Sequence, residues 1–182
     1  MKRRLFVAGL SAAPLIASLE VSAQAITWQT IVGPELRFRF EMPAPVEKTT
    51  AAEKEEGHAA PRIAWASKHN GQNFDFDFAD YREGWFTKRD SRVMAKELGR
   101  GDAEKAFTKD KYRYMRDEPV EQQGWDGYAL DIEDPGGLMV VMRTYIVKDR
   151  MYRLLGTATT DPQTRLDANH FLNSFKLAEA RQ

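Results

Sequence analysis

Residues 138–160 read LMVVMRTYIVKDRMYRLLGTATT, two apolar runs separated by the polar tripeptide Lys148-Asp149-Arg150. In the first run, apolar side chains occupy both parities, with Met142 on one and Val141 and Tyr145 on the other. A strand that is apolar on both sides is normally covered on both sides. This segment therefore predicts a long β-hairpin at the centre of a sheet.

A second hairpin is predicted upstream, because Asn70-Gly71, a dipeptide typical of tight primed turns, separates strand candidates at 62–69 and 72–81. The charged segment 47–60 predicts a loop or a frayed strand end. Three alternating phenylalanines are expected to face the core, and the residues between them to face solvent: Phe74, Phe76 and Phe78 against Asp75, Asp77 and Ala79. The other strand candidates are 26–32, 36–42 (with Leu36, Phe38, Phe40 and Met42 inward), 118–123 and 125–133.

Two helical regions are predicted. Asp90 or Ser91 can cap a helix that Gly99 ends, with Val93, Met94 and Leu98 as its apolar stripe. Residues 103–109 either form a second short helix or continue the first. Asp161 and Pro162 open the last helix, which carries an apolar stripe and is followed by a tail from Leu177: Ala168, Phe171, Leu172 and Phe175. Together these elements predict an α+β fold, with a central antiparallel sheet of about six or seven strands and helices on its faces.

The N-terminus has the pattern of a secretory signal peptide. A basic Lys2-Arg3-Arg4 precedes the apolar stretch 5–19, and Ala23-Gln24-Ala25 supplies the small residues of a cleavage site. The apolar stretch is broken by Pro14 and is short for a membrane span. We expect cleavage near Ala25, a single domain over 26–182, and a periplasmic or secreted mature chain without a transmembrane segment. The paired arginines leave both the general secretory and the twin-arginine routes open.

Composition narrows the function classes. The chain has 27 basic and 27 acidic residues and no cysteine. Balanced charge gives no support for binding nucleic acid or anionic membranes. The absence of cysteine excludes a thiol nucleophile, a thiolate metal site and a lipid anchor on cysteine.

Three segments together resemble the PsbP/Mog-like superfamily, which includes DcrB-like exported bacterial proteins. They are a strand ending in Met-Pro-x-Pro at 38–45, a polar hairpin tip followed by tyrosine at 147–154, and a closing Phe-Leu-x-Ser-Phe-Lys-Leu at 171–177. The resemblance spans nearly the whole mature chain, but its motifs are structural. It implies an α/β/α sandwich, and it implies accessory or binding proteins such as extrinsic photosystem subunits, exported lipoproteins and a small-GTPase-binding factor, without a shared active site. This chain lacks the lipid-bearing cysteine of many bacterial relatives, so the resemblance implies a soluble mature protein.

Two groups of side chains are candidates for chemistry. Asp167, His170 and Ser174 share a helical stripe and contain the residue types of a hydrolase triad. A regular helix, however, supplies no oxyanion hole beside the serine, so a polar flank is the simpler interpretation. The second group is a possible metal site on one strand and is also explained by a solvated strand face: Asp75, Asp77 and Asp80, with Asp131 or Glu133 as further donors.

Aromatic and histidine residues add weak candidates. Trp85 and Trp125 could anchor a partner or a ligand, although burial against the core is the simpler interpretation. The three histidines have no ligand-like spacing: His58, His69 and His170. The leading hypothesis is therefore a non-enzymatic accessory or binding protein of the bacterial cell envelope that binds another envelope protein and needs no cofactor. The alternatives are a small-ligand or metal-binding periplasmic protein and, with least support, a hydrolase.

Overall fold

The computed structural model describes residues 25–51, 60–86, 89–106 and 112–178. Residues 1–24 of the predicted signal peptide, His58 and residues 107–109 of the predicted helical segment 103–109 lie outside these ranges. The described elements are β1 Trp28–Val32, η1 Pro34–Leu36, β2 Phe38–Pro43, β3 Glu47–Thr50, β4 Ile63–His69, β5 Gln72–Asp80, α1 Ser91–Ala106, β6 Arg113–Gln122, β7 Trp125–Glu133, β8 Met139–Val147, β9 Arg150–Ala158, α2 Pro162–Ser174 and β10 Lys176–Leu177.

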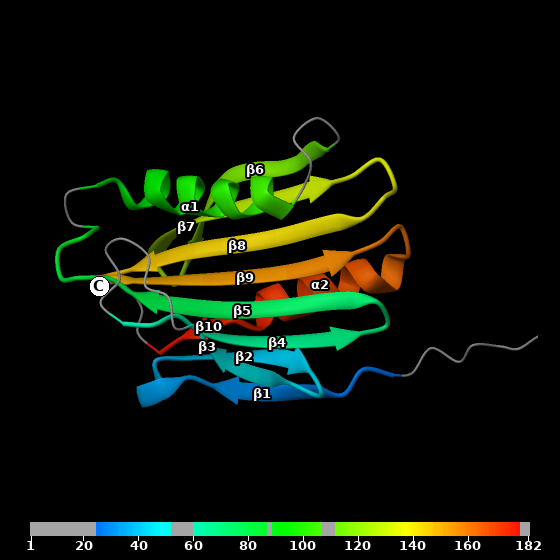
Figure 1. Cartoon of the computed structure of the whole chain (residues 1–182), viewed down its shortest axis with the longest axis horizontal. Coiled ribbons are helices and arrows are strands. Elements are labelled where there is room, and N and C mark those ends of the chain that lie inside the picture. The colour runs from blue at the N-terminus through cyan, green and yellow to red at the C-terminus, as the bar shows by residue number, and fades with distance from the viewer. Residues whose placement is uncertain (1–24, 52–59, 87–88, 107–111, 179–182) are drawn as a thin grey trace, which may run out of the picture.

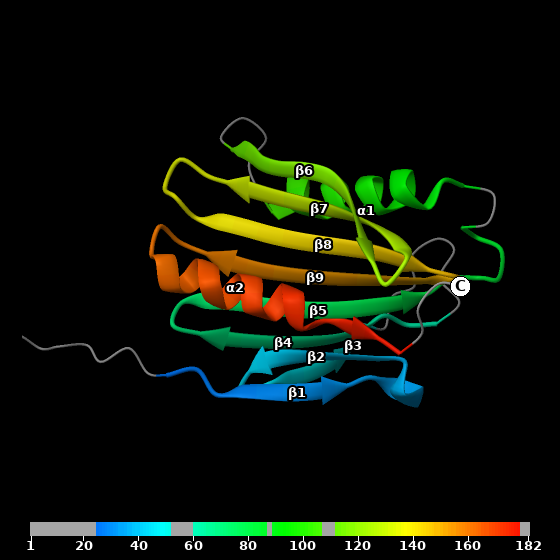
Figure 2. The same ribbon diagram turned by 180° about the vertical axis from the view of Figure 1, so that it is seen from behind.

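Seven strands form one antiparallel sheet in the order β3-β4-β5-β9-β8-β7-β6, and three form a second sheet in the order β1-β2-β10. Helices α1 and α2 lie on opposite faces of the large sheet (Figures 1 and 2). The small sheet packs on the α2 side, because Phe38 and Phe40 of β2 join Phe171 of α2 in one hydrophobic cluster. The predicted α+β architecture, with helices on both faces of an antiparallel sheet, is confirmed.

The predicted central hairpin is β8–β9, which occupies the middle of the large sheet. Val147 pairs with Arg150, so the turn contains Lys148, at φ 56°, and Asp149. Every residue of β8 except Val147 is buried. The apolar pattern on both sides of this strand therefore correctly indicated cover on both faces.

The two helices begin as predicted. The side chain of Asp161 accepts a hydrogen bond from the Gln163 amide (2.9 Å) at the start of α2. Asp90 accepts one from the Arg92 amide (2.8 Å) ahead of α1. Helix α1 continues through Gly99 as a single helix, and the side chain of Val93 is exposed, so the expected end and part of the expected stripe were wrong.

Three further expectations need correction at the small sheet and the sheet edge. Leu36 does not face the core but is 74% exposed, because positive φ angles at Glu35 and Leu36 turn the chain before β2 begins. Part of the expected loop 47–60 is the exposed edge strand β3. The expected C-terminal tail begins with β10, which pairs with β2.

Candidate binding groove

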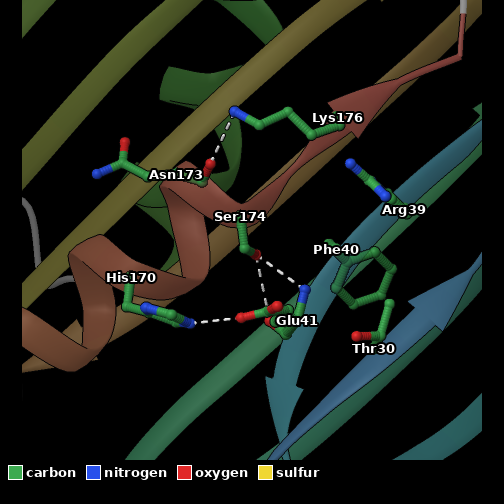
Figure 3. Close-up of a pocket in the computed structure, with 8 residues that line it drawn as sticks. All are labelled: Thr30, Arg39, Phe40, Glu41, His170, Asn173, Ser174 and Lys176. Atoms are coloured by element: carbon green, nitrogen blue, oxygen red, sulfur yellow. Dashed lines mark hydrogen bonds and ion pairs between the residues drawn. The ribbon is translucent and has the colours of Figure 1, made fainter.

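A groove of about 490 Å³ lies between the small sheet and the C-terminal end of α2 (Figure 3). Strand β2 supplies one wall, α2 the other, and β1 and β10 the ends. The side chains that decide its chemistry are Thr30, Arg39, Glu41, His170, Ser174 and Lys176.

Ser174 joins the end of α2 to the edge of β2. Its hydroxyl accepts a hydrogen bond from the Glu41 amide (2.8 Å) and donates one to the Phe171 carbonyl (2.6 Å). Strand β10 pairs with β2 through Arg39 and Lys176, and Glu41 is two residues further along β2. The hydroxyl therefore occupies the place that a further residue of β10 would take beside β2, and it satisfies the Glu41 amide. This is a structural role for the serine.

His170 takes its carboxylate partner from β2. Its Nε2 lies 2.6 Å from a Glu41 carboxylate oxygen, and its ring lies against Trp28 with centroids 4.2 Å apart (Figure 3). Both members of the pair are about half exposed. At such exposure the contact adds little stability, and its main effect is to position the two side chains.

The three polar residues of the α2 stripe, Asp167, His170 and Ser174, each have a different hydrogen-bond partner and do not form a triad. Asp167 is buried and accepts a hydrogen bond from the Gln163 side chain (2.8 Å), while His170 pairs with Glu41. The hydroxyl proton of Ser174 goes to a carbonyl of its own helix. This geometry does not provide the nucleophile, base and orienting carboxylate that a triad requires.

Two cationic residues, Arg39 and Lys176, lie at the rim of the groove. Arg39 and Lys176 are directly opposite in the β2–β10 pairing, and both are exposed. The Lys176 ammonium donates to the Asn173 carbonyl at the end of α2 (3.1 Å), where the helix dipole favours positive charge. Like charges directly opposite on adjacent strands repel each other, so this rim is suited to an anionic group.

The acidic residues of β5 are not on a solvated face, contrary to the sequence expectation. Asp77 is 4% exposed and accepts two hydrogen bonds from Arg153 (2.9 and 2.6 Å), which lies opposite it on β9. Asp80 forms a bidentate pair with Arg150 (2.5 and 2.8 Å), again its register partner. Ala79, also expected to face solvent, is fully buried. The arginines of β9 were too distant in sequence for this pairing to be predicted.

Asp75 lies on the same strand, between Phe74 and Phe76, and is partly buried. Burial, and then the nearby charge of Asp77, raise its pKa above the ordinary range. The other proposed donors also have arginine partners: Asp131 with Arg143 and Glu133 with Arg113. Within the described ranges, no group of three or more metal-ligating side chains is assembled.

The two candidate tryptophans do not share a surface. Trp85 stacks on Tyr81 and lies under the Arg89 guanidinium, next to the cluster that contains α1 residues. Trp125 packs against the cluster on the α2 side. Both are partly buried. His69 ends β4 beside the Asn70-Gly71 turn, away from the groove residues named above.

Sequence reasoning identified His170 and Ser174 but assigned them a different context. The alternation in 36–42 placed Arg39 and Glu41 on the outer side of a strand, and that signal was correct. Glu41 and His170, which contact each other in the folded chain, are 129 positions apart in the sequence. No local pattern could have paired them.

Comparison with protein-family models gives no match, and no curated protein matches either. Among solved structures, cyanobacterial PsbP (CyanoP) from Synechocystis is similar, with a TM-score of 0.57 at 8% identity, covering 92% of this chain and 98% of that one. LpqN of Mycobacterium tuberculosis, described as involved in cell envelope biogenesis, gives 0.49 at 10% identity over 85% of this chain and 92% of its own. A Bacteroides thetaiotaomicron protein gives 0.44 at 12% identity, covering 84% and 48%.

The similarity to CyanoP extends over nearly the full length of both chains and shows a shared fold. The class defined here is therefore an α+β domain with the PsbP-like fold. In the described part of the chain, no helix combines the length and apolar character needed to cross a membrane.

Proposed function

We propose that this chain is an exported, non-enzymatic accessory or binding protein of the bacterial cell envelope, with another envelope protein as its partner. The groove carries the proposal. The Ser174 hydroxyl is hydrogen-bonded to backbone groups of the protein itself. Arg39 and Lys176, by contrast, are exposed cationic residues on adjacent strands at the rim. Such an arrangement recognises a charged surface without transforming it.

Two further observations support this assignment. The sequence before Ile26 has the pattern of a cleaved signal peptide, which supports export. The fold shared with CyanoP supports an accessory role by analogy of fold. Side chains capable of catalysis in the groove, His170 and Ser174, have structural partners, which favours binding over reaction.

Site-specific photocrosslinking in living cells tests the proposal. A photoreactive amino acid at Asn173, exposed in the groove, is expected to give one recurrent adduct in the envelope fraction. The matched control is Glu97, exposed on α1 across the large sheet. Mass spectrometry identifies the adduct. An adduct of equal yield at both positions, or none at Asn173, contradicts a partner bound at the groove, and a full-length chain found in the cytoplasm contradicts export.

A second candidate function is binding of a small ligand at the end of the large sheet. A cavity of about 730 Å³ lies there, with Tyr81 and Tyr152 as aromatic walls and Arg37 at its rim. This volume is in the range of small-molecule sites. Thermal-shift screening with small organic anions tests it, since a specific ligand should raise the melting temperature of the native chain but not of Arg37→Ala.

A further inference from the structure

Among the residues that the structure describes, no strand pairs with β1 on the side away from β2, so β1 is an open edge of the small sheet. The Ala44 amide bonds to the Thr27 carbonyl (2.9 Å), and the Gly33 amide bonds to the Phe38 carbonyl (2.9 Å). In an antiparallel ladder hydrogen-bonded pairs alternate, so Gln29 and Ile31 direct their backbone groups to β2. The N–H and C=O groups of the alternate residues point outward, away from β2: Trp28, Thr30 and Val32.

The other edges of the two sheets are protected in ways that β1 is not. Strand β3 carries charges, and β6 carries many charges, Pro119 and an irregularity between Tyr114 and Arg116. Charged residues, proline and irregular pairing at an edge strand all disfavour the addition of another strand. Strand β1, with the sequence WQTIV, has no charge and no proline, and its register with β2 is regular.

The opposite edge of the small sheet is closed by a side chain. The Gln123 amide group donates to the Leu177 carbonyl (2.9 Å) and accepts from the Leu177 amide (2.7 Å), as a neighbouring strand would. Gln122 similarly donates to the Phe175 carbonyl (3.0 Å). Strand addition to the small sheet is therefore directed to β1.

The charges beside β1 indicate what kind of strand fits. Val32, Arg39 and Lys176 form one row across the sheet. Thr30 begins the next row, in which Glu41 is already paired with His170. Trp28, partly buried, begins the row after that. With strands about 4.8 Å apart, a residue added opposite Val32 can reach Arg39 with a long acidic side chain.

We infer that β1 binds an extended, acidic segment of a partner protein as an added antiparallel strand. Read from its N-terminus, the segment has glutamate opposite Val32, a hydroxyl residue opposite Thr30 and an apolar β-branched residue opposite Trp28, each separated by one residue. This inference rests on the proposed binding function and specifies its mode, which is backbone pairing for affinity and alternate side chains for specificity. A second copy paired symmetrically about Thr30 would instead set Trp28 opposite Val32 and bring no acid to Arg39 and Lys176.

Amide hydrogen exchange of the mature chain with a synthetic peptide tests this mode. The probe is a short blocked peptide in which glutamate, threonine and valine alternate with threonines, and its partner probe has lysine for glutamate. The glutamate peptide is expected to slow exchange at the outward amides of Trp28, Thr30 and Val32. The amides of Gln29 and Ile31, bonded to β2, should change little.

Two variants separate the backbone and charge contributions. Thr30→Pro removes the central outward donor, in a position where an edge strand tolerates proline, and should abolish the protection, whereas Thr30→Val should retain it. The lysine peptide should bind about tenfold more weakly than the glutamate peptide. Arg39→Glu combined with Lys176→Glu should reverse that preference, while Arg82→Glu, on the loop after β5, should leave it unchanged.

Three results would overturn the inference. They are no protection by the glutamate peptide at millimolar concentration, equal binding of both peptides, and protection without peptide that grows with protein concentration, which would identify a second copy as the occupant. The Asn173 crosslink is measured independently of the peptide experiment. If the crosslink forms but the peptide does not bind, strand addition is rejected and the proposed binding function is retained. Absence of the crosslink would reject the proposed function.

Discussion

The two faces of the large sheet are packed differently. On the α2 side, phenylalanines from β2, β5 and α2 form a continuous cluster in which Phe40, Phe76 and Phe171 are fully buried. On the α1 side, the cluster is smaller and mixes three aromatic residues with aliphatic and sulfur-containing side chains: Tyr81, Phe86, Tyr128, Ile146, Met151, Met94, Ala79 and Ala95. The aromatic side joins elements distant in sequence through large rigid rings, whereas the α1 side relies on a helix with two internal glycines. We infer that the α2 side supplies most of the packing free energy.

The largest effect is expected from truncating the aromatic side. Phe76 contacts Phe40 with ring centroids 4.2 Å apart and is fully buried. Phe76→Ala should lower the free energy of unfolding by about 4 kcal/mol through lost burial and a residual cavity. Met94→Ala on the α1 side should cost about 2 kcal/mol. Urea denaturation measures both, and equal losses would remove the distinction between the faces.

A slightly smaller effect is expected from the ion pair inside β5–β9. Asp77→Ala removes the carboxylate that accepts two hydrogen bonds from the largely buried Arg153 guanidinium and should cost about 3 kcal/mol. The double variant Asp77→Leu/Arg153→Met removes both charges and should recover much of that loss. A double variant no more stable than the single one would show that the pair itself, and not the uncompensated charge, dominates.

A gain in stability is expected on the α1 side. A Cβ added at Gly101 meets no atom within 4 Å, so Gly101→Ala should stabilise the protein by about 0.5–1 kcal/mol through helix propensity. At Gly99 the added Cβ would lie 3.3 Å from the Thr144 hydroxyl, and the gain should be smaller. Thermal unfolding compares the two variants. A larger gain at Gly99 would mean that packing there is looser than the distances indicate.

The smallest effect is a pH dependence at Asp75. Because its pKa is raised in the folded protein, the folded state binds the proton more tightly than the unfolded state. Its contribution to stability therefore falls as pH rises from the ordinary carboxyl range through the raised pKa. Asp75→Asn should raise the melting temperature near pH 8 and change it little near about pH 4. An equal rise at both pH values would contradict this origin.

Local sequence was sufficient where a short pattern has one physical solution. The apolar runs of 138–160, the Asn70-Gly71 turn and the Asp161-Pro162 helix start all appear as predicted. Their signals depend on side-chain period, on permitted φ angles and on capping of free amides, and each acts within a few residues. The α+β class followed from the order of such elements.

Tertiary structure decided which side chains of these elements contact one another. The β5–β9 register set Arg153 and Arg150 opposite Asp77 and Asp80, and so replaced an expected solvated face with one largely buried and one partly buried ion pair. The packing of α2 on β2 joined His170 and Ser174 to Glu41 and left the groove with Arg39 and Lys176 at its rim. Sequence alone determined most of the elements and their order, because those depend on local free energies. The groove and the open edge of β1 depend on contacts between distant residues, which only the folded chain brings together.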